Sequence, residues 1–337
     1  MSGGTDSSVA AMLLQDAGYE VTGITFRFYE PNNQTQYLND AASLASQLKI
    51  KHIVFDARPL FQEKVVQYFI NEYMEGRTPV PCVICNNQLK WKLLRQVADE
   101  LQINYISCGH YAQIISLNRN YYVADGVDPE KNQSFFLWGL SQDILKRTIF
   151  PLGEFNKGTV RKIAAERGFS AIAAKKDSIG VCFCPSDYRS FLRNHLPNGQ
   201  LITSGFFEDE SGKIIGKHQG YPFYTVGQRR GLGINFQKPT FVKAIIPETN
   251  RVVLSELNGL ERTTMQVEDY KIVDEADFNE PVICKIRYRK QATWAKVSDF
   301  GGDYLTVDFL EPVTAVASGQ SAVFYKGNQV LGGGIIR

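Results

Sequence analysis

The chain has 337 residues, of which 44% are hydrophobic and 21% charged, a composition typical of a globular protein with two or three domains. Its 37 basic and 35 acidic residues nearly balance, so bulk charge favours no nucleic-acid partner and only local clusters can indicate one. Since no apolar run is long enough to cross a bilayer, we expect no membrane partner and a cytoplasmic location.

Helical and strand patterns alternate along the first half of the chain. The order is helix 9–18, strand 20–26, helix 38–48, strand 52–55, helix 60–73, helix 89–101 and strand 105–108. This order predicts an α/β domain with a doubly wound, Rossmann-like parallel sheet. We expect the domain to span residues 1–198, with a linker at residues 197–199.

From about residue 200 the pattern changes to glycine-rich, all-β sequence. Short β-type runs occur at 252–254, 282–288, 304–309 and 322–325. They predict small β-domains, the last of them barrel-like. We place a central β-domain at residues 199–265 and a C-terminal β-barrel at residues 266–337.

A glycine-rich segment leads directly into the first predicted helix. It consists of Ser2, Gly3, Gly4, Thr5, Asp6, Ser7 and Ser8. Glycines allow a ligand to approach the backbone, and a helix N-terminus offers free N–H groups to an anion. The segment lacks the Gly-Lys-Ser/Thr end of a Walker A loop. It therefore indicates another kind of phosphate loop, although an ordinary helix cap after a glycine turn would give the same letters.

Four of the six cysteines lie in two short motifs beside lysines. The motifs are Cys82-x-x-Cys85, followed by Lys90 and Lys92, and Cys182-x-Cys184, preceded by Lys175 and Lys176. A thiol beside cations at a helix N-terminus has a pKa below the usual value of about 8.5. We therefore expect reactive thiolates at these two motifs.

Metal binding is the competing interpretation of the same four cysteines. Cys82, Cys85, Cys182 and Cys184 together have the ligand types of a zinc site or an iron–sulfur cluster. The sequence leaves metal and redox chemistry open, and we favour redox or acid/base use. Cys108 and Cys284 lie inside strand-like runs, where a cysteine is usually a small buried hydrophobe.

The phosphate loop and further motifs carry a family resemblance. Residues 2–8 resemble the S-G-G-x-D-S-S signature of the PP-loop ATP pyrophosphatases. The further motifs are Gly76-Arg77-Thr78-Pro79, Cys85-Asn86, Gly109-His110-Tyr111, Gln133-Ser134-Phe135-Phe136-Leu137, Lys176-Asp177-Ser178, Gly180-Val181-Cys182-Phe183, Gly227-Gln228-Arg229-Arg230-Gly231, Arg287-Tyr288-Arg289, Gly319-Gln320-Ser321 and Gly332-Gly333-Gly334. Over nearly the whole chain, they resemble the tRNA-specific 2-thiouridylases.

The resemblance implies an ATP-dependent sulfurtransferase that thiolates C2 of a wobble uridine in tRNA. It implies ATP with Mg²⁺ on residues 2–8, near Phe26 and Gly109. A sulfur carrier protein would load a persulfide onto Cys182, and that sulfur would replace the adenylated C2 oxygen. Cys85 would act as the nucleophile that releases the sulfur and would end in a disulfide with Cys182. We expect a monomer or weak dimer.

The resemblance also implies contacts with tRNA. It assigns them to His110, Lys131, Asn132, Gln133, Arg287, Tyr288 and Gln320. The basic residues around Tyr288 offer charge and a stacking surface suited to a splayed-out base. Arg229 and Arg230 in a glycine-rich loop have the charge to contact the RNA backbone. Each cluster alone is also compatible with an ordinary solvated face.

The chain departs from the family pattern at four places. Cys82 stands where the family has an aspartate assigned as general acid/base, and Asn132 stands where the family has Asp. The segment between Phe26 and Leu38 is shorter than in the family. The family's phosphate loop follows a central strand, so we expect an apolar strand upstream of Met1, with Met1 an internal methionine.

Two other functions fit part of the sequence. A tRNA-binding paralogue without activity would account for the loss of the family aspartate at Cys82, but not for Cys85, Cys182 and the intact loop. Another adenylating PP-loop ligase, of the amidotransferase type, would need an ammonia source, and no glutaminase-like segment is present. Loss of 2-thiouridine from tRNA in a deletion strain would distinguish the enzyme from both.

Overall fold

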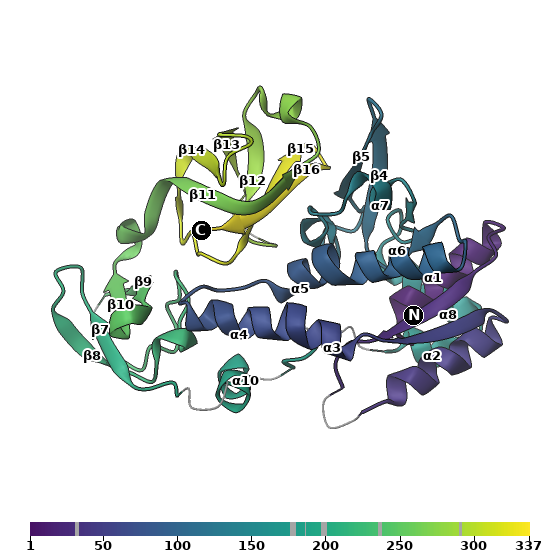
Figure 1. Cartoon of the computed structure of the whole chain (residues 1–337), viewed down its shortest axis with the longest axis horizontal. Helices are drawn as coiled ribbons and strands as arrows, with labels where there is room; N and C mark the ends of the chain where they lie inside the picture. The colour runs from purple at the N-terminus through teal and green to yellow at the C-terminus, as the bar shows by residue number, and fades with distance from the viewer. Residues whose placement is uncertain (31–33, 176–179, 186, 197–200, 235–237, 290–291) are drawn as a thin grey trace. The chain divides into compact units, whose positions relative to one another are not determined.

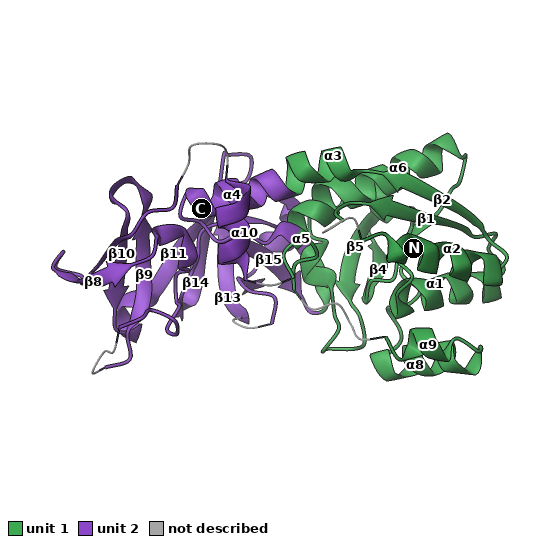
Figure 2. Cartoon of the chain, turned by 90° about the horizontal axis from the view of Figure 1, so that it is seen from below, with its two compact units in different colours: residues 1–65, 82–185, 328–330 green, residues 66–81, 186–327, 331–337 purple. Residues whose placement is uncertain are grey.

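The computed structural model describes residues 1–337 except 31–33, 176–179, 186, 197–200, 235–237 and 290–291 (Figure 1). The described chain forms two compact units. Unit 1 comprises residues 1–65, 82–185 and 328–330, and unit 2 comprises residues 66–81, 186–327 and 331–337 (Figure 2). The expected linker at residues 197–199 lies mostly in a segment outside the described residues, and the three-part division stays a prediction.

Unit 1 contains two pairs of parallel strands. β1 (Thr22–Arg27) pairs with β2 (Lys51–Asp56), and β3 (Ile106–Ser107) pairs with β6 (Thr148–Ile149). The predicted parallel α/β class is therefore confirmed. In Figure 2, α2 and α1 lie on one side of the β1–β2 pair and α3 and α6 on the other, as a doubly wound sheet requires.

The helices of unit 1 include ones at the positions predicted from residues 9–18, 38–48, 60–73 and 89–101, and others that were not predicted. They are α1 (Thr5–Asp16), α2 (Gln36–Gln47), α3 (Arg58–Phe61), α5 (Pro81–Ile84, its first residue in unit 2), α6 (Trp91–Glu100), α7 (Gln142–Leu145), α8 (Lys157–Glu166) and α9 (Ser170–Ala173). Met12, Leu44 and Val160 pack together in a core between α1, α2 and α8. Residues 62–66 and 85–90 are single π-helical turns, a local widening that is frequent at functional sites.

A hairpin in unit 1 was not predicted. β4 (Ala112–Leu117) pairs with β5 (Asn120–Asp125) in antiparallel register. The two turn residues, Asn118 and Arg119, have φ values of 50° and 69°. In a sequence, such a turn is usually recognised by the pair Asn-Gly. Here Arg119 occupies the glycine position, so the sequence pattern did not indicate a turn.

Unit 2 contains a four-stranded sheet and a closed barrel. The sheet has the order β8 (Ile214–His218), β7 (Gly205–Glu208), β10 (Arg251–Ser255), β9 (Phe241–Ile246). The barrel has the order β11 (Glu261–Ile272), β14 (Leu305–Thr314), β13 (Ala292–Ser298), β12 (Val282–Lys285), β15 (Ser321–Lys326), β16 (Gln329–Ile336). β11 also pairs with β16, which closes the barrel and confirms the barrel-like end of the chain.

Unit 2, in its described part, also contains the α-helices α4 (Gln67–Met74) and α10 (Tyr188–His195). The rings of Tyr73 and Tyr188 stack at 4.7 Å and join the two helices. No helix among the described residues is long and apolar enough to cross a membrane.

Candidate active site

The phosphate loop has backbone geometry that only glycine adopts easily. Gly3 has a φ of +66°, and a Cβ there would lie 2.7 Å from the Cβ of Asp40. No side chain caps the N-terminus of α1, so its first-turn N–H groups, which have no intrahelical partner, face outward. The hydroxyls of Ser7 and Ser8 donate back to the Gly4 carbonyl, at 3.2 and 2.6 Å. The loop therefore offers an anion its backbone, as a polyphosphate site requires.

Gly109 lies against the same loop. A Cβ on Gly109 would be 2.7 Å from the carbonyl carbon of Asp6 and 2.8 Å from the backbone nitrogen of Ser7. Two segments about a hundred positions apart in sequence thus meet at the start of α1. The family resemblance assigned both the loop and Gly109 to ATP, and in the structure the two lie in contact.

Asp6 is held by two residues that sequence reasoning did not assign to the site. Its carboxylate accepts hydrogen bonds from the Tyr111 hydroxyl at 2.8 Å and the Lys157 ammonium at 2.6 Å. Lys175 similarly donates to the Gly3 carbonyl at 2.9 Å and to the Asp40 carboxylate at 2.6 Å. No spacing in the sequence signals Lys157, because it begins a helix more than a hundred residues later.

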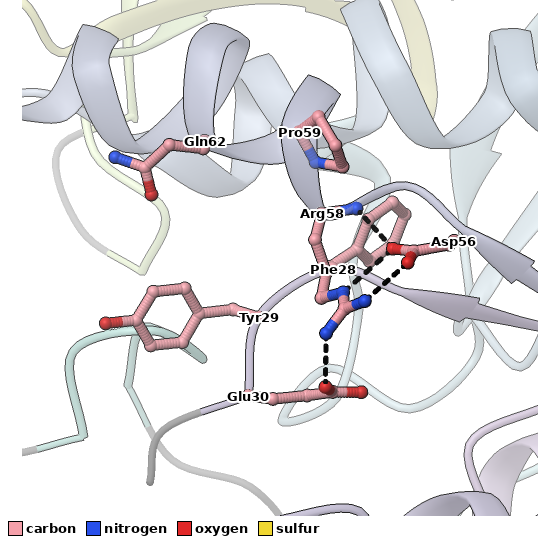
Figure 3. A pocket seen from close by; sticks show the side chains of 7 residues that line it. All are labelled: Phe28, Tyr29, Glu30, Asp56, Arg58, Pro59 and Gln62. Atoms are coloured by element: carbon pink, nitrogen blue, oxygen red, sulfur yellow. Dashed lines mark hydrogen bonds and ion pairs between the residues drawn. The ribbon is translucent and has the colours of Figure 1, made fainter. Parts of the chain in front are cut away.

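A pocket of about 430 Å³ opens beyond the carboxyl ends of β1 and β2, the edge where doubly wound sheets bind ligands. Its lining residues are Phe28, Tyr29, Glu30, Asp56, Arg58, Pro59 and Gln62. In Figure 3 the Arg58 guanidinium lies between the carboxylates of Asp56 and Glu30, donating to Glu30 at 3.2 Å. Phe26, which we expected beside ATP, stacks on Phe28 at 5.4 Å and does not line the pocket.

A tight turn presents Cys182. The Cys184 N–H donates to the Val181 carbonyl at 3.0 Å, so Cys182 and Phe183 occupy the two central positions. Phe183 is 2% exposed and packs on Phe61 at 5.7 Å, while Cys182 is exposed. The buried ring anchors the turn against Phe61 of α3 and leaves Cys182 at the surface of unit 1.

Three of the cysteines lie within electrostatic reach of one another. Cys85 interacts with Cys182 and Cys82, and all three with Lys90. Burial raises the pKa of Cys85 to about 12 and that of Cys182 to about 11, and it also raises the pKa of Cys82. The expected lowering of the thiol pKa values was wrong, because desolvation of the thiolate outweighs the attraction of Lys90. Cys182 is an exposed residue, yet enough protein surrounds its thiol for desolvation to raise the pKa.

The described cysteines do not form a metal-binding arrangement with other side chains. Within the part of the chain that the structure describes, no three His, Cys, Asp or Glu side chains are arranged to hold a metal ion. The same described residues include Cys82, Cys85, Cys182 and Cys184, all free cysteines.

His110 lies inside unit 1. It is 7% exposed, and its ring stacks on Trp91 at 6.1 Å. Its Nδ1 lies 2.6 Å from the sulfur of Cys108. Burial lowers its pKa well below the ordinary value, so the imidazole is neutral at pH 7 and packs as part of the core.

The neighbouring expected tRNA contacts form a loop tied to Tyr111. The Oε1 of Gln133 accepts from the Tyr111 N–H at 3.1 Å, and the Oδ1 of Asn132 accepts from the Ser134 N–H at 3.1 Å. Lys131 is half-buried in the same loop. These amides therefore shape the loop, and its lysine supplies the charge.

The expected tRNA residues of unit 2 divide into structural and exposed groups. The Arg287 guanidinium donates to the carbonyls of Val226 and Ala315, each at 3.2 Å, and Gln320 donates to the Thr78 carbonyl at 2.7 Å. Arg289 is exposed and lies over the Tyr288 ring at 5.5 Å. Lys290 and the triplet Lys176-Asp177-Ser178 lie outside the described residues.

Exposed charge in unit 2 also occurs in the loop over residues 225–230. Arg229 and Arg230 are exposed there, and the Gln228 amide holds the loop by donating to the Arg230 carbonyl at 2.9 Å. Among the described residues neither guanidinium group has a hydrogen bond or ion pair, so both have the exposure that contact with a phosphate backbone would need.

Family models match almost the whole chain. One described as "tRNA methyl transferase HUP domain" matches residues 1–186, and one described as "tRNA methyl transferase PRC-barrel domain" matches residues 189–256. A third, "Aminomethyltransferase beta-barrel domain", matches residues 262–336. The three matches follow one another along the chain and leave only residues 187–188, 257–261 and 337 unmatched.

Curated relatives match over full length under a different name. "tRNA-specific 2-thiouridylase MnmA 2" of Phocaeicola vulgatus is 55% identical over 338 residues, which cover 100% of this chain and 96% of the relative. "tRNA-specific 2-thiouridylase MnmA 1" of Bacteroides fragilis is 54% identical, covering 100% and 95%. "tRNA-specific 2-thiouridylase MnmA" of Cytophaga hutchinsonii is 43% identical, covering 100% and 96%.

Proposed function

The chain belongs to the tRNA-specific 2-thiouridylase family, and from that premise we propose that it uses ATP to replace the C2 oxygen of a wobble uridine in tRNA with sulfur. The cysteine cluster of unit 1 carries the proposal. A methyl transfer, which the family-model descriptions name, would give Cys85 and Cys182 no role, whereas sulfur transfer needs two thiols.

The first step is activation of the uridine. ATP would bind with its triphosphate on residues 2–8 and against Gly109, and Asp6 is the carboxylate of the loop that would hold the accompanying Mg²⁺, which would neutralise charge on the phosphates. The uridine O2 attacks the α-phosphorus, and pyrophosphate leaves. Support comes from the uncapped N-terminus of α1 and from the close approach of Gly109 to the loop backbone.

The second step is sulfur transfer. A sulfur carrier protein leaves a persulfide on Cys182, and its terminal sulfur attacks C2 of the adenylated uridine. The Cys85 thiolate then attacks the Cys182 sulfur, which forms a Cys85–Cys182 disulfide and leaves the transferred sulfur on C2 while AMP departs with the oxygen. An external dithiol reduces the disulfide for the next turnover.

The surroundings of the two cysteines support this division of roles. Cys182 is on an exposed turn, where a carrier protein can reach it. Cys85 is on a buried helical turn and interacts electrostatically with Cys182. Cys82, also within reach of Cys182, takes the place of the family aspartate as a thiol acid/base or as a redox partner of Cys85.

The tRNA is bound by exposed charge and aromatic surface. We assign contacts to Lys131, Tyr288 with Arg289, and the arginines at 229 and 230, because these remain accessible in their own units. Cationic side chains supply most nonspecific affinity for RNA, and an aromatic ring can stack an extruded base. We further propose three domains, 1–198, 199–265 and 266–337, and a monomer or weak dimer.

The test is thiolation of tRNA by the purified protein. Cys182→Ser should abolish formation of 2-thiouridine from ATP and a persulfide donor, because a serine oxygen cannot carry the sulfur. Cys184→Ser, two residues away on the same turn, is the matched control and should keep most activity. Nucleoside mass spectrometry measures the product, and near-normal turnover by Cys182→Ser would refute the persulfide assignment.

A further inference from the structure

A π-helical turn aligns Lys90 with the cysteine motif. Residues 85–90 form the turn, and the Trp91 N–H bonds to the Asn86 carbonyl five residues earlier. Such i→i+5 bonding places residues five apart nearly above one another. In an α-helix, with 3.6 residues per turn, the fifth residue lies about 0.4 of a turn further round. The widened turn therefore brings Lys90 over Cys85.

Lys90 interacts electrostatically with every thiol of the site. It favours the thiolates of Cys82, Cys85 and Cys182, and it also acts on the buried Cys108 and His110. All of these side chains belong to unit 1. Lys90 is thus close enough to both cysteine motifs to act electrostatically on each of them.

The ammonium of Lys90 has no counter-charge among the residues that the structure describes. It makes no hydrogen bond and no ion pair with any of them, and its side chain is half-buried. The two other lysines near the site differ, because Lys157 is paired with Asp6 and Lys175 with Asp40. A half-buried cation without a partner is unfavourable, so an anion arriving at the site would be stabilised.

The chemistry of sulfur transfer supplies such an anion. Each step of the proposed function requires a sulfur anion, first on Cys182 and then on Cys85. Burial disfavours both thiolates, with the pKa of Cys85 raised to about 12. A nearby cation reduces the free-energy cost of forming a buried anion.

We propose that Lys90 is the electrostatic positioning residue of the sulfur-transfer site, whose ammonium holds the sulfur anion on Cys182 and then on Cys85. The inference rests on the proposed function for its catalytic meaning, but the interaction itself needs neither tRNA nor ATP. It can therefore be tested separately from turnover.

The first experiment measures the charge near Cys182 with two alkylating reagents. Iodoacetate is anionic and iodoacetamide is neutral, so the ratio of their rates at one pH reports a nearby cation. Lys90→Gln should lower this ratio at Cys182 by about fivefold, the size expected for removing one unit charge at short range. Lys90→Arg should keep it. Peptide mass spectrometry follows Cys182 alone.

The matched control is Lys92→Gln. Lys92 follows Lys90 by two residues, is exposed, and makes no ion pair with a described residue; its loss should leave the ratio unchanged. The salt dependence of the wild-type ratio needs no variant, and the ratio should fall as ionic strength rises. An unchanged ratio in folded Lys90→Gln, or a salt-independent wild-type ratio, would overturn the proposal.

The second experiment separates this inference from the proposed function. In single-turnover thiolation, Lys90→Gln should lower the rate at saturation by about ten- to a hundredfold, with Lys90→Arg restoring it and the KM for ATP and tRNA unchanged. A wild-type protein that makes no 2-thiouridine but keeps the reagent ratio would refute the proposed function alone. A normal rate in Lys90→Gln would refute the role of Lys90 alone.

Discussion

The phosphate loop of unit 1 and the loop over residues 225–230 of unit 2 are both glycine-containing and rich in hydrogen-bonding groups, yet their polar groups are used differently. In the phosphate loop the serine hydroxyls bond back to the Gly4 carbonyl, and no side chain caps the first turn of α1. In loop 225–230 the carbonyl of Val226 accepts from the Arg287 guanidinium. The phosphate loop leaves the N–H groups at the start of α1 for a ligand. Loop 225–230 is instead held in place by a hydrogen bond from the Arg287 side chain.

The difference shows how residue type relates to function. A polar side chain is available to a substrate only when the fold does not already use its hydrogen-bonding groups. Arg287 and Gln320 carry the charge or amide expected of an RNA contact, but both donate to backbone carbonyls within unit 2. Arg229 and Arg230, by contrast, are exposed, and their side chains make no hydrogen bond or ion pair with any residue that the structure describes.

Among substitutions that test this difference between the two loops, we expect Gly109→Ala to have the largest effect. In Gly109→Ala the added Cβ would press on the Asp6 and Ser7 backbone at 2.7 and 2.8 Å. Since the loop must move, we expect ATP affinity to fall by about tenfold or more, which is about 1.4 kcal/mol of binding free energy.

A control and a second binding measurement make the Gly109 test specific. Gly302→Ala, whose nearest neighbour lies 3.3 Å from the added Cβ, should leave ATP affinity unchanged. Calorimetry measures ATP binding, and filter binding should find tRNA affinity retained. Equal weakening of ATP and tRNA binding in Gly109→Ala would show that unit 1, not the loop, is damaged.

The structural use of Arg287 predicts an intermediate effect on stability. Arg287→Ala leaves the carbonyls of Val226 and Ala315 without their donor and should lower the free energy of unfolding by about 2 kcal/mol. Arg230→Ala, at an exposed side chain, should change stability by less than about 0.5 kcal/mol but weaken tRNA binding. Urea denaturation checks both. Weakened tRNA binding with unchanged stability in Arg287→Ala would make Arg287 a contact residue after all.

Much of the fold and part of the site could be predicted from the sequence. Periodicity gave the parallel α/β class and the β-barrel, because apolar spacing directly reflects which face is buried. The loop and Gly109 could be paired only through family resemblance. Lys157 carried no signal, since its contact with Asp6 depends on tertiary structure.

The thiol pKa values were missed for a physical reason. Nearby lysines are visible in the sequence, but the burial that opposes them is not. Burial raises the pKa of Cys85 despite the attraction of Lys90. Likewise, the buried position of His110 could not be read from a Gly-His-Tyr motif.

The smallest expected effect is on how the alkylation rate of the Cys182 thiol depends on pH. Because its pKa is raised to about 11 from an ordinary 9.0, alkylation of the native protein should still accelerate above pH 9, whereas the denatured protein should level off near that pH. The unfolded thiol loses its proton first, so the thiol's contribution to stability is intact below pH 9 and lost as pH rises towards 11. Iodoacetamide kinetics check this, and a native rate that levels off near pH 9 would contradict the burial of the thiol.

The central claim is that the two cysteines of unit 1 serve tRNA thiolation. The most direct measurement is mass spectrometry of nucleosides from tRNA of a strain that lacks this gene. The account predicts that 2-thiouridine disappears from at least one tRNA, returns with the wild-type gene and with Cys184→Ser, and does not return with Cys182→Ser. Unchanged 2-thiouridine in the deletion strain, or its restoration by Cys182→Ser, would contradict the account.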